Sequence, residues 1–350
     1  MDITVVGIDL GKSVFHLHGI DARGKEVFRK RLSRSRLADF VAQLPQCLIA
    51  MEACGGSHYW GRRFREFGHE VRLIAPQYVK PYVKTNKNDM ADAAAIAEAA
   101  TRGHMSWVEI KSEHAQAVLS VHRVIARRKR ARTALINELR GILLEFGIAL
   151  PKGVQGMKKR LWELRHPVRA CDLSIPEPII PVVDNLLEKL TVLEAAIAQS
   201  EQKIEAHVRD DEQCQRLMTI PGIGKANASA LVATVGNAAA FDNARQFAAW
   251  LGLVPRQQGT GGVTRLMGIS KRGDPYLRYL LVHAARACIL HVTRKKVRPE
   301  NMLADWIDGL VNAKHPNVAA LAVANKLARM VYAMLRDGTE YAPAVKQAAV

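Results

Sequence analysis

Four carboxylates occur at positions where they could hold metal ions for chemistry on phosphates. Asp9 and Glu52 each end a run of apolar residues, 3–8 and 48–51, which is the pattern of a buried strand. Asp89 and Asp92 are three positions apart and therefore share one face of a helix. Two divalent cations assist phosphoryl transfer, and Mg²⁺ prefers oxygen ligands. The sequence therefore predicts a Mg²⁺ site, although Asp89 and Asp92 alone could simply favour the N-terminal end of their helix.

The chain has 350 residues and a formal net charge of +18, with 49% apolar and 24% charged residues. This composition indicates a globular protein of two or three domains whose partner is a polyanion, nucleic acid before any other. No apolar run reaches the roughly 18 residues of a membrane span, and the N-terminus lacks a signal-peptide pattern, so no membrane partner is expected. The cysteines show no CxxC pair, which is typical of reduced thiols in a cytoplasmic protein: Cys47, Cys54, Cys171, Cys214 and Cys288.

Residues 1–105 predict an α/β domain in which a hairpin precedes strand–helix units. A strand at 3–8, a turn at 21–24 with strands on both sides, and strands at 47–52 and 71–75 alternate with helices. This order is expected of a ribonuclease-H-like fold, whose sheet places the ends of the first and fourth strands side by side. Asp9, Glu52 and the helix that starts at Asp89 would then converge.

Residues 106–212 change character and predict a helical linker. A long helix at 115–146 is followed by a connection at 151–181 with little periodicity. Apolar residues then recur at heptad-like spacing, which indicates a helical hairpin or short coiled coil. Core packing is the default interpretation of this stripe, and dimerisation is the second. Its members are Leu186, Leu190, Leu193, Ile197 and Ile204.

Basic and glycine-rich segments provide candidate nucleic-acid contacts. The long helix carries a basic run that could follow a phosphate backbone or simply face solvent. Residues 213–350 predict a mostly α C-terminal domain, in which segment 217–225 has the pattern helix, glycine-rich hairpin, helix. That pattern is typical either of a helix-hairpin-helix DNA contact or of a tight structural turn. The candidates are Arg127, Arg128, Lys129, Arg130, Arg132, Gly222, Gly224 and Lys225.

A hydroxyl between glycines provides a candidate nucleophile. Thr260 lies in a predicted polar loop at 256–262, where the flanking glycines leave it sterically open. Many threonines in such loops only turn the chain. Ser270 is a competing hydroxyl, and its expected role is to cap the helix that begins near residue 274. The basic residues expected around Thr260 are Arg256, Arg265, Lys271 and Arg272.

Six motifs occur in an order found in one protein family. They are residues 7–9 (Gly-Ile-Asp), 51–53 (Met-Glu-Ala), 87–92 (Lys-Asn-Asp-Met-Ala-Asp), 220–224 (Ile-Pro-Gly-Ile-Gly), 252–256 (Gly-Leu-Val-Pro-Arg) and 269–273 (Ile-Ser-Lys-Arg-Gly). Together they resemble the DEDD transposases of bacterial insertion sequences, the insertion-sequence-110 family, and within it the 1111 group. The resemblance covers nearly the whole chain.

The resemblance implies a RuvC-like N-terminal domain, a helical linker that mediates assembly and a C-terminal transposase domain. It implies that Asp9, Glu52, Asp89 and Asp92 bind Mg²⁺. It further implies recombination of donor and target DNA guided by a structured bridge RNA from the element's non-coding end. The family's nucleophile is a serine that forms a phosphoserine link to DNA, and the assembly is a tetramer in which the acids of one subunit meet the serine of another.

The sequence departs from this family pattern at the serine. Counting from Pro255, the matching position is Thr260, followed by Gly261. Threonine can serve as a nucleophile, but its methyl group adds crowding and restricts χ1. We therefore expect Thr260 to take the role, with Ser270 as a substitute or an impaired copy of the enzyme as the alternatives.

Three other functions fit parts of the sequence. An actin-like or sugar kinase shares an Asp-x-Gly after the first strand, but the later half holds no convincing second loop of that kind, and a charge of +18 suits a metabolic enzyme poorly. A RuvC-type Holliday-junction endonuclease would share the fold and the acids but would cleave with water and leave no protein–DNA adduct. A non-catalytic nucleic-acid-binding protein would not need the set of carboxylates.

Overall fold

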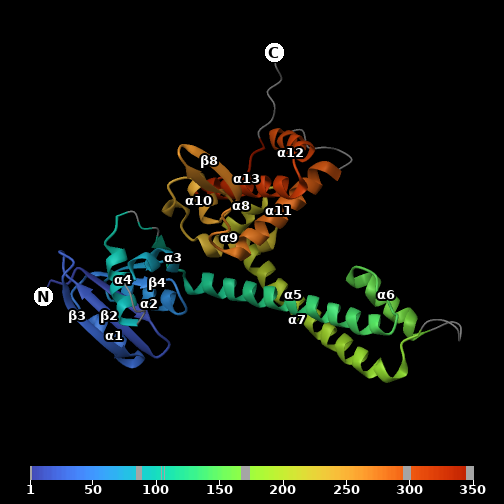
Figure 1. Cartoon of the computed structure of the whole chain (residues 1–350), viewed down its shortest axis with the longest axis horizontal. Coiled ribbons are helices and arrows are strands. Elements are labelled where there is room, and N and C mark those ends of the chain that lie inside the picture. Colours follow the sequence, from blue (N-terminus) through green and yellow to red (C-terminus); the bar gives the residue numbers. More distant parts are fainter. Residues whose placement is uncertain are drawn as a thin grey trace, which may run out of the picture. The chain divides into compact units, whose positions relative to one another are not determined.

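The computed structural model describes residues 2–83, 89–103, 105, 107–166, 174–294 and 301–343. The chain forms two compact units (Figure 1). Unit 1 comprises residues 1–116 and 235–237, and unit 2 comprises residues 117–234 and 238–350. Cys171 and the first two residues of the 87–92 motif lie outside the described residues.

Unit 1 is built on a six-stranded sheet with the order β3-β2-β1-β4-β5-β6. The β1–β2, β2–β3 and β5–β6 pairs are antiparallel, whereas β1–β4 and β4–β5 are parallel. The predicted α/β domain is confirmed, and its mixed sheet is compatible with a DEDD nuclease-like fold. The strands are β1 (Val5–Leu10), β2 (Val14–Ile20), β3 (Glu26–Ser33), β4 (Leu48–Glu52), β5 (Glu70–Ile74) and β6 (Trp107–Val108).

Different helices cover the two faces of this sheet, because side chains alternate along each strand. Val6 and Ile8 of β1 pack in a core with residues of α1 and α2, whereas Val5 packs in a second core with alanines of α4. Alternation therefore directs Gly7 and Asp9 towards the face that α4 covers. The helices of unit 1 are α1 (Arg34–Ala42), α2 (Ser57–Glu66), α3 (Pro76–Val79), η1 (Lys80–Tyr82) and α4 (Asp89–Ala100).

Two long helices, α5 (Glu113–Glu145) and α7 (Ile180–Asp210), run side by side in opposite directions in unit 2 (Figure 1). The heptad-like stripe is buried at every position except Leu193, which is half-buried. The expectation of an aperiodic connection at 151–181 is wrong in part. That stretch contains α6 (Val154–Arg165), which buries Met157, Leu161 and Leu164 against the α5–α7 pair but leaves Trp162 exposed. It also contains the short η2 (Glu177–Ile179).

Among its described residues, the rest of unit 2 consists of helices, one β-hairpin and the segments that connect them. Its helices are α8 (Glu212–Met218), α9 (Lys225–Val235), η3 (Ala238–Ala240), α10 (Ala244–Trp250), α11 (Pro275–Arg294), α12 (Met302–Ala313) and α13 (Pro316–Asp337). Among the described residues, α13 alone is long and apolar enough to cross a membrane. However, Val323, Leu327 and Val331 are fully buried, and α13 packs on α10 and α11, which is typical of a core helix.

Candidate active site

Asp9 and Glu52 lie at the carboxyl ends of two neighbouring parallel strands. In the β1–β4 register, Ile8 is the partner of Met51, so the next residue of each strand is one of the two acids. Both acidic side chains are half-buried. The structure thus brings together the two carboxylates that the sequence predicts at this edge of the sheet.

The helix α4 brings two further acids, Asp89 and Asp92 in its first turn, to the same edge. The approach of α4 to β1 is close, because a Cβ atom placed on Gly7 would lie only 2.3 Å from the carbonyl oxygen of Ala93. Only a residue without a side chain permits that distance. Gly7 therefore sets the position of α4 relative to Asp9.

The electrostatics of Asp9 report the convergence of all four acids. Its pKa is raised from 3.8 to about 6. Burial is the largest cause, the negative charges of Asp89, Asp92 and Glu52 add to it, and His16 acts in the opposite direction. Carboxylates held this close repel one another, and a divalent cation would relieve that repulsion.

His16 belongs to the same cluster, although the sequence analysis did not select it. It is the partner of Asp9 across the β1–β2 pair, and its Nδ1 lies 3.7 Å from a carboxylate oxygen of Asp89. Asp9, His16 and Asp89 each offer a ligand atom within 4.8 Å of the other two. This donor set fits a divalent cation, because both carboxylate oxygen and imidazole nitrogen bind such ions.

Thr260 lies at the end of a β-strand, so the prediction of a loop at 256–262 is wrong. β7 (Pro255–Thr260) pairs with β8 (Val263–Ile269), and Thr260 faces Val263 across a two-residue turn. The turn residues are Gly261 and Gly262, with φ of 59° and 81°, as a type I′ hairpin turn requires. The glycine pair thus closes a hairpin. All residues of β7 are exposed, so the Thr260 side chain is accessible to solvent.

The base of this hairpin is fastened to the helices of unit 2. Nη1 of Arg278 donates hydrogen bonds to the carbonyl oxygens of Leu251 at 3.1 Å and Arg272 at 2.9 Å. A Cβ atom on Gly273 would lie 1.9 Å from the carbonyl oxygen of Trp250, so the two chain segments touch there. The basic residues expected near Thr260 lie on the hairpin or directly after it and are all exposed: Arg256, Arg265, Lys271 and Arg272.

Ser270 does not cap α11, contrary to the prediction. Asp274 does, because its Oδ1 accepts hydrogen bonds from the backbone N–H groups of Tyr276 at 2.7 Å and Leu277 at 3.3 Å. An aspartate directly before a helix is a favoured N-cap, and Ser270 lies too far upstream to reach the same donors. The backbone N–H of Ser270 instead donates a hydrogen bond of 2.8 Å to the carbonyl oxygen of Val254, at the base of the hairpin.

The basic run of α5 divides into residues that pair with α7 and residues open to solvent. Arg128 donates hydrogen bonds to a carbonyl oxygen of α7 and to the hydroxyl of Ser200, at 2.7 and 2.6 Å. Lys129 forms an ion pair of 2.7 Å with Glu201 of the same helix. These two residues hold the helices together, which a sequence pattern cannot distinguish from a nucleic-acid contact. Of the others, Arg127 and Arg130 are exposed and Arg132 is half-buried.

The glycine-rich segment after residue 217 joins α8 to α9. Gly222 has φ of +88°, and a Cβ atom there would lie 2.4 Å from the carbonyl oxygen of Ala284 in α11, so this glycine is required for packing. Around Gly224, no heavy atom of the described residues lies within 4 Å of such a Cβ. Lys225 pairs with Glu205 of α7. Gly224 is therefore the position at which a phosphate could approach the backbone.

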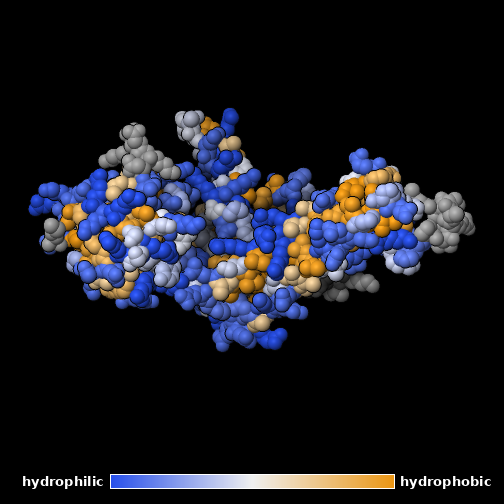
Figure 2. Space-filling model, turned by 90° about the horizontal axis from the view of Figure 1, so that it is seen from below, coloured by the Kyte–Doolittle hydropathy of each residue, from blue (hydrophilic) through white to orange (hydrophobic). Residues whose placement is uncertain are grey.

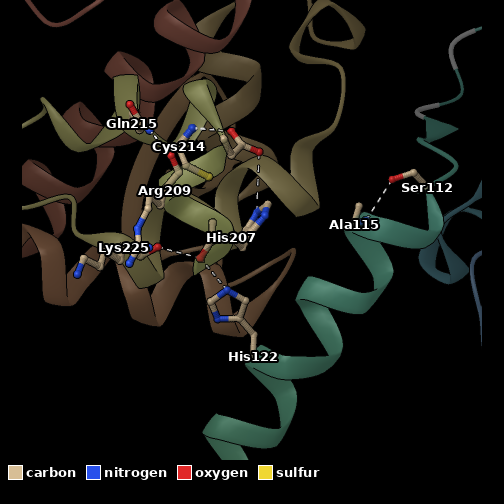
Figure 3. Close-up of polar contacts among 10 residues, drawn as sticks. Ser112, Ala115, His122, His207, Arg209, Cys214, Gln215 and Lys225 are labelled. Atoms are coloured by element: carbon tan, nitrogen blue, oxygen red, sulfur yellow. Dashed lines mark hydrogen bonds and ion pairs between the residues drawn. The ribbon is translucent and has the colours of Figure 1, made fainter. Parts of the chain in front are cut away.

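A row of buried hydrogen bonds connects this turn to α5 (Figure 3). Nε2 of His122 lies 2.9 Å from the hydroxyl of Ser229, which donates to the carbonyl oxygen of Lys225 at 2.8 Å. Nδ1 of His122 lies 3.0 Å from the hydroxyl of Tyr276. Burial, with a smaller effect of His207, lowers the pKa of His122 to about 4. His122 is therefore neutral near pH 7 and connects α5 to α9 and α11.

A second group of metal-ligand residue types lies where α7 meets α8 (Figure 3). His207, Asp211 and Cys214 offer ligand atoms within 4.8 Å of one another. Asp211 accepts a hydrogen bond from the backbone N–H of Cys214 at 2.9 Å as the N-cap of α8, and its other oxygen lies 3.9 Å from Nε2 of His207. These contacts are those of a capped helix junction and account for the three residues without an ion.

Comparison with known proteins identifies relatives of one kind. A family model described as a DEDD transposase of IS110 type matches residues 6–148, and one for the IS116/IS110/IS902 transposase family matches residues 214–299. The chain is 49% identical over 343 residues, 98% of its length and 100% of the relative's, to a probable family 20 transposase of Pseudomonas aeruginosa. It is 41% identical over 340 residues (97% and 99%) to the transposase for insertion sequence element IS1328 of Yersinia enterocolitica, and 40% identical over 341 residues (97% and 92%) to that for IS1111A of Coxiella burnetii.

Proposed function

The chain belongs to the IS110/IS1111 family of insertion-sequence transposases, and from that premise we propose that it cuts and rejoins DNA at the acid cluster with Thr260 as the nucleophile. The observation that carries the proposal is the convergence of Glu52, Asp89 and Asp92 on Asp9, whose pKa they help to raise to about 6. Such a cluster suits Mg²⁺, which we propose as the ion used in the reaction. When bound, the cations would activate the nucleophile and neutralise charge on the phosphate.

In the proposed step, Oγ1 of Thr260 attacks the phosphorus of a DNA phosphodiester. A new P–O bond to threonine forms while the P–O bond to one deoxyribose oxygen breaks. The proton of the threonine hydroxyl passes to a solvent base, and the leaving oxygen takes a proton from solvent. Attack by a deoxyribose hydroxyl of another strand reverses these changes, so it rejoins DNA and restores Thr260. The energy of the broken bond is thus kept in the protein–DNA link.

Positive side chains around the hairpin would hold the phosphates during this exchange. Arg256 and Arg265 on the hairpin are exposed, and each can neutralise a phosphate. On the α5 helix, we assign the nucleic-acid contact to Arg127 and Arg130, because Arg128 is occupied by α7. The α8–α9 turn would act as a helix-hairpin-helix that approaches the backbone of DNA or RNA at Gly224.

We further propose that the reaction is guided by a structured bridge RNA and occurs in an oligomer. In this proposal, residues 1–105 form the RuvC-like catalytic domain, residues 106–212 the coiled-coil linker and residues 213–350 the transposase domain. Dimers would assemble into a tetramer in which the acids of one copy act with Thr260 of another. Large apolar side chains exposed on the linker support assembly through it: Leu144, Phe146, Trp162, Val182 and Val192.

Figure 2 shows hydrophobic surface among hydrophilic surface at the end of unit 2 that carries α6. An apolar surface of this kind marks an interaction site in a protein that otherwise exposes polar groups. Since the substrate is DNA of a bacterial element, the proposed place of action is the cytoplasm.

The test uses the purified full chain with junction DNA of its element, the flanking non-coding RNA and Mg²⁺. A denaturing gel detects a covalent protein–DNA adduct, and mass spectrometry maps the modified residue. We expect an adduct on Thr260 that disappears with Asp9→Ala and that requires the RNA. Thr260→Ser should retain strand exchange, whereas Thr260→Ala should abolish it.

The other outcomes separate the alternatives. An adduct on Ser270 would keep the recombinase and move the nucleophile. Cleaved DNA without an adduct would indicate a RuvC-type endonuclease that uses water. Binding of DNA or RNA that is unaffected by Asp9→Ala, without any cleavage, would indicate a non-catalytic nucleic-acid-binding protein.

A further inference from the structure

His16 is placed by the sheet directly beside the acid cluster. It is the Cα partner of Asp9 in the antiparallel β1–β2 pair, and side chains of directly opposite residues lie on the same face. The imidazole is largely buried, with 13% of its side chain exposed, so its position is defined by the strand and the surrounding core. A histidine at this place adds a nitrogen donor to a set that otherwise consists of carboxylates.

The distances suit a ligand of the same ion that Asp9 and Asp89 would hold. Nδ1 of His16 lies 3.7 Å from a carboxylate oxygen of Asp89, and the donors of all three residues lie within 4.8 Å of one another. Ligands of one octahedral cation with bonds of about 2.1 Å are about 3 Å apart. The Asp89 side chain is 71% exposed and can move by that difference, while Asp9 and His16 are fixed on the sheet.

We propose that Nδ1 of His16 is a ligand in one metal position, together with Asp9 and Asp89, and that this position prefers a divalent first-row transition cation to Mg²⁺. The inference rests on the proposed metal centre and adds the identity of a donor and its selectivity. Mg²⁺ binds through oxygen and keeps its waters, whereas transition cations accept imidazole nitrogen readily. Glu52 and Asp92 would then contribute to an oxygen-only position, where Mg²⁺ serves.

A second interpretation of His16 is an ion pair with Asp89 that only orders the first turn of α4. The two interpretations differ in what a substitution does to metal selectivity. An ordering role would weaken all cations alike when His16 is changed, because the oxygen donors would be misplaced for each of them. A ligand role would weaken Mn²⁺ much more than Mg²⁺.

The experiment titrates the metal-free full chain with Mn²⁺, followed by electron paramagnetic resonance, and displaces the bound Mn²⁺ with Mg²⁺. The variants are His16→Ala, which removes the donor, and His16→Asn, whose side-chain oxygen lies near the place of Nδ1. The matched control is His18→Asn. His18 is on the same strand and face, and its Nδ1 lies 3.7 Å from Glu26 rather than beside the acids.

We expect His16→Ala to lower the affinity for Mn²⁺ at least about 10-fold, which is the usual effect of losing one partner at a metal site, and the affinity for Mg²⁺ less than about 3-fold. His16→Asn should remove the preference for Mn²⁺ while keeping a folded site, and His18→Asn should leave the ratio unchanged. Pulsed electron paramagnetic resonance should detect coupling of bound Mn²⁺ to an imidazole nitrogen in the unsubstituted chain and in neither His16 variant.

Two results would overturn the inference. One is an unchanged Mn²⁺ to Mg²⁺ ratio in both His16 variants, and the other is nitrogen coupling that survives in His16→Ala. Its failure can be told from failure of the proposed function. Cation binding that Asp9→Ala abolishes but His16→Ala leaves intact would overturn only the role of His16, whereas binding indifferent to Asp9→Ala would remove the metal centre itself.

Discussion

The position of α4 over β1 makes Gly7→Ala the sharpest test of how the fold builds the site. The added Cβ would lie 2.3 Å from the carbonyl oxygen of Ala93 and 2.5 Å from the backbone nitrogen of Ala97. Ordinary contact begins at 3.4 Å, so the helix backbone must retreat by about 1 Å. Because Asp89 lies in the first turn of that helix, the retreat moves it away from Asp9.

The expected effects are a modest loss of stability and a large loss of activity. Overpacking of this kind typically costs about 1–3 kcal/mol, and replacing glycine in a strand returns about 0.5–1 kcal/mol of backbone entropy. The net decrease in unfolding free energy is therefore between about 0 and 2.5 kcal/mol. Displacing reacting groups by about 1 Å can lower the rate about 100-fold, so catalysis should fall by that order while the protein stays folded.

The assay compares single-turnover cleavage of junction DNA, Mn²⁺ affinity and urea denaturation for Gly7→Ala and a control. Gly103→Ala is suitable, because no heavy atom of the described residues lies within 4 Å of a Cβ at Gly103. A second variant sharpens the test. Since the clash is with the helix backbone, adding Ala97→Gly to Gly7→Ala should not restore activity. If Gly7→Ala kept the cleavage rate and the Mn²⁺ affinity of the unsubstituted chain, the argument that Gly7 positions α4 would be refuted.

Three further predictions concern pH and the hairpin base. Burial and neighbouring carboxylates raise the pKa of Asp9 to about 6, so its ionisation lowers the stability of the metal-free fold as pH rises from about 4 to 6, and the whole loss is present above pH 6. We therefore expect Asp9→Asn to raise the melting temperature in EDTA at pH 7.5 but hardly at pH 4.5. Burial, with a smaller effect of His207, lowers the pKa of His122 to about 4. The unfolding free energy measured in urea should therefore decrease as pH drops from 6.5 to 4, and His122→Gln should make this decrease smaller. Gly273→Ala, at φ +79°, should cost at least about 2 kcal/mol in urea denaturation, whereas Gly268→Ala should stay within about 0.5 kcal/mol.

The four acids could be predicted because each follows from a local rule. Asp9 and Glu52 end apolar runs, and a parallel pair of strands brings such ends to one edge. Asp89 and Asp92 are spaced for one face of a helix that the structure begins at Asp89 itself. No tertiary information is needed for these steps beyond the strand order.

His16 could not be selected in the same way, because its role depends on register between strands. Alternation along 13–20 predicts only that position 16 shares a face with 14 and 18. Its pairing with Asp9 is set by the short turn at residues 11–13, and an explicit hairpin register from that turn would have found it. The contact of Arg128 with α7 could not be predicted for a related reason, since it depends on helix packing that the basic run itself does not encode.

The hairpin that carries Thr260 shows how position and exposure are combined in one element. An isolated two-stranded hairpin is marginally stable in water, and Leu266 and Val263 on this one are 67% and 65% exposed. Its base, however, is fixed by Arg278 and by the close contact at Gly273. Thr260, the proposed nucleophile, therefore lies near the exposed tip of a hairpin whose base is fixed. Because apolar side chains gain stability when they are covered, we expect docking of a nucleic acid or another subunit on this hairpin to stabilise it, and Thr260 with it.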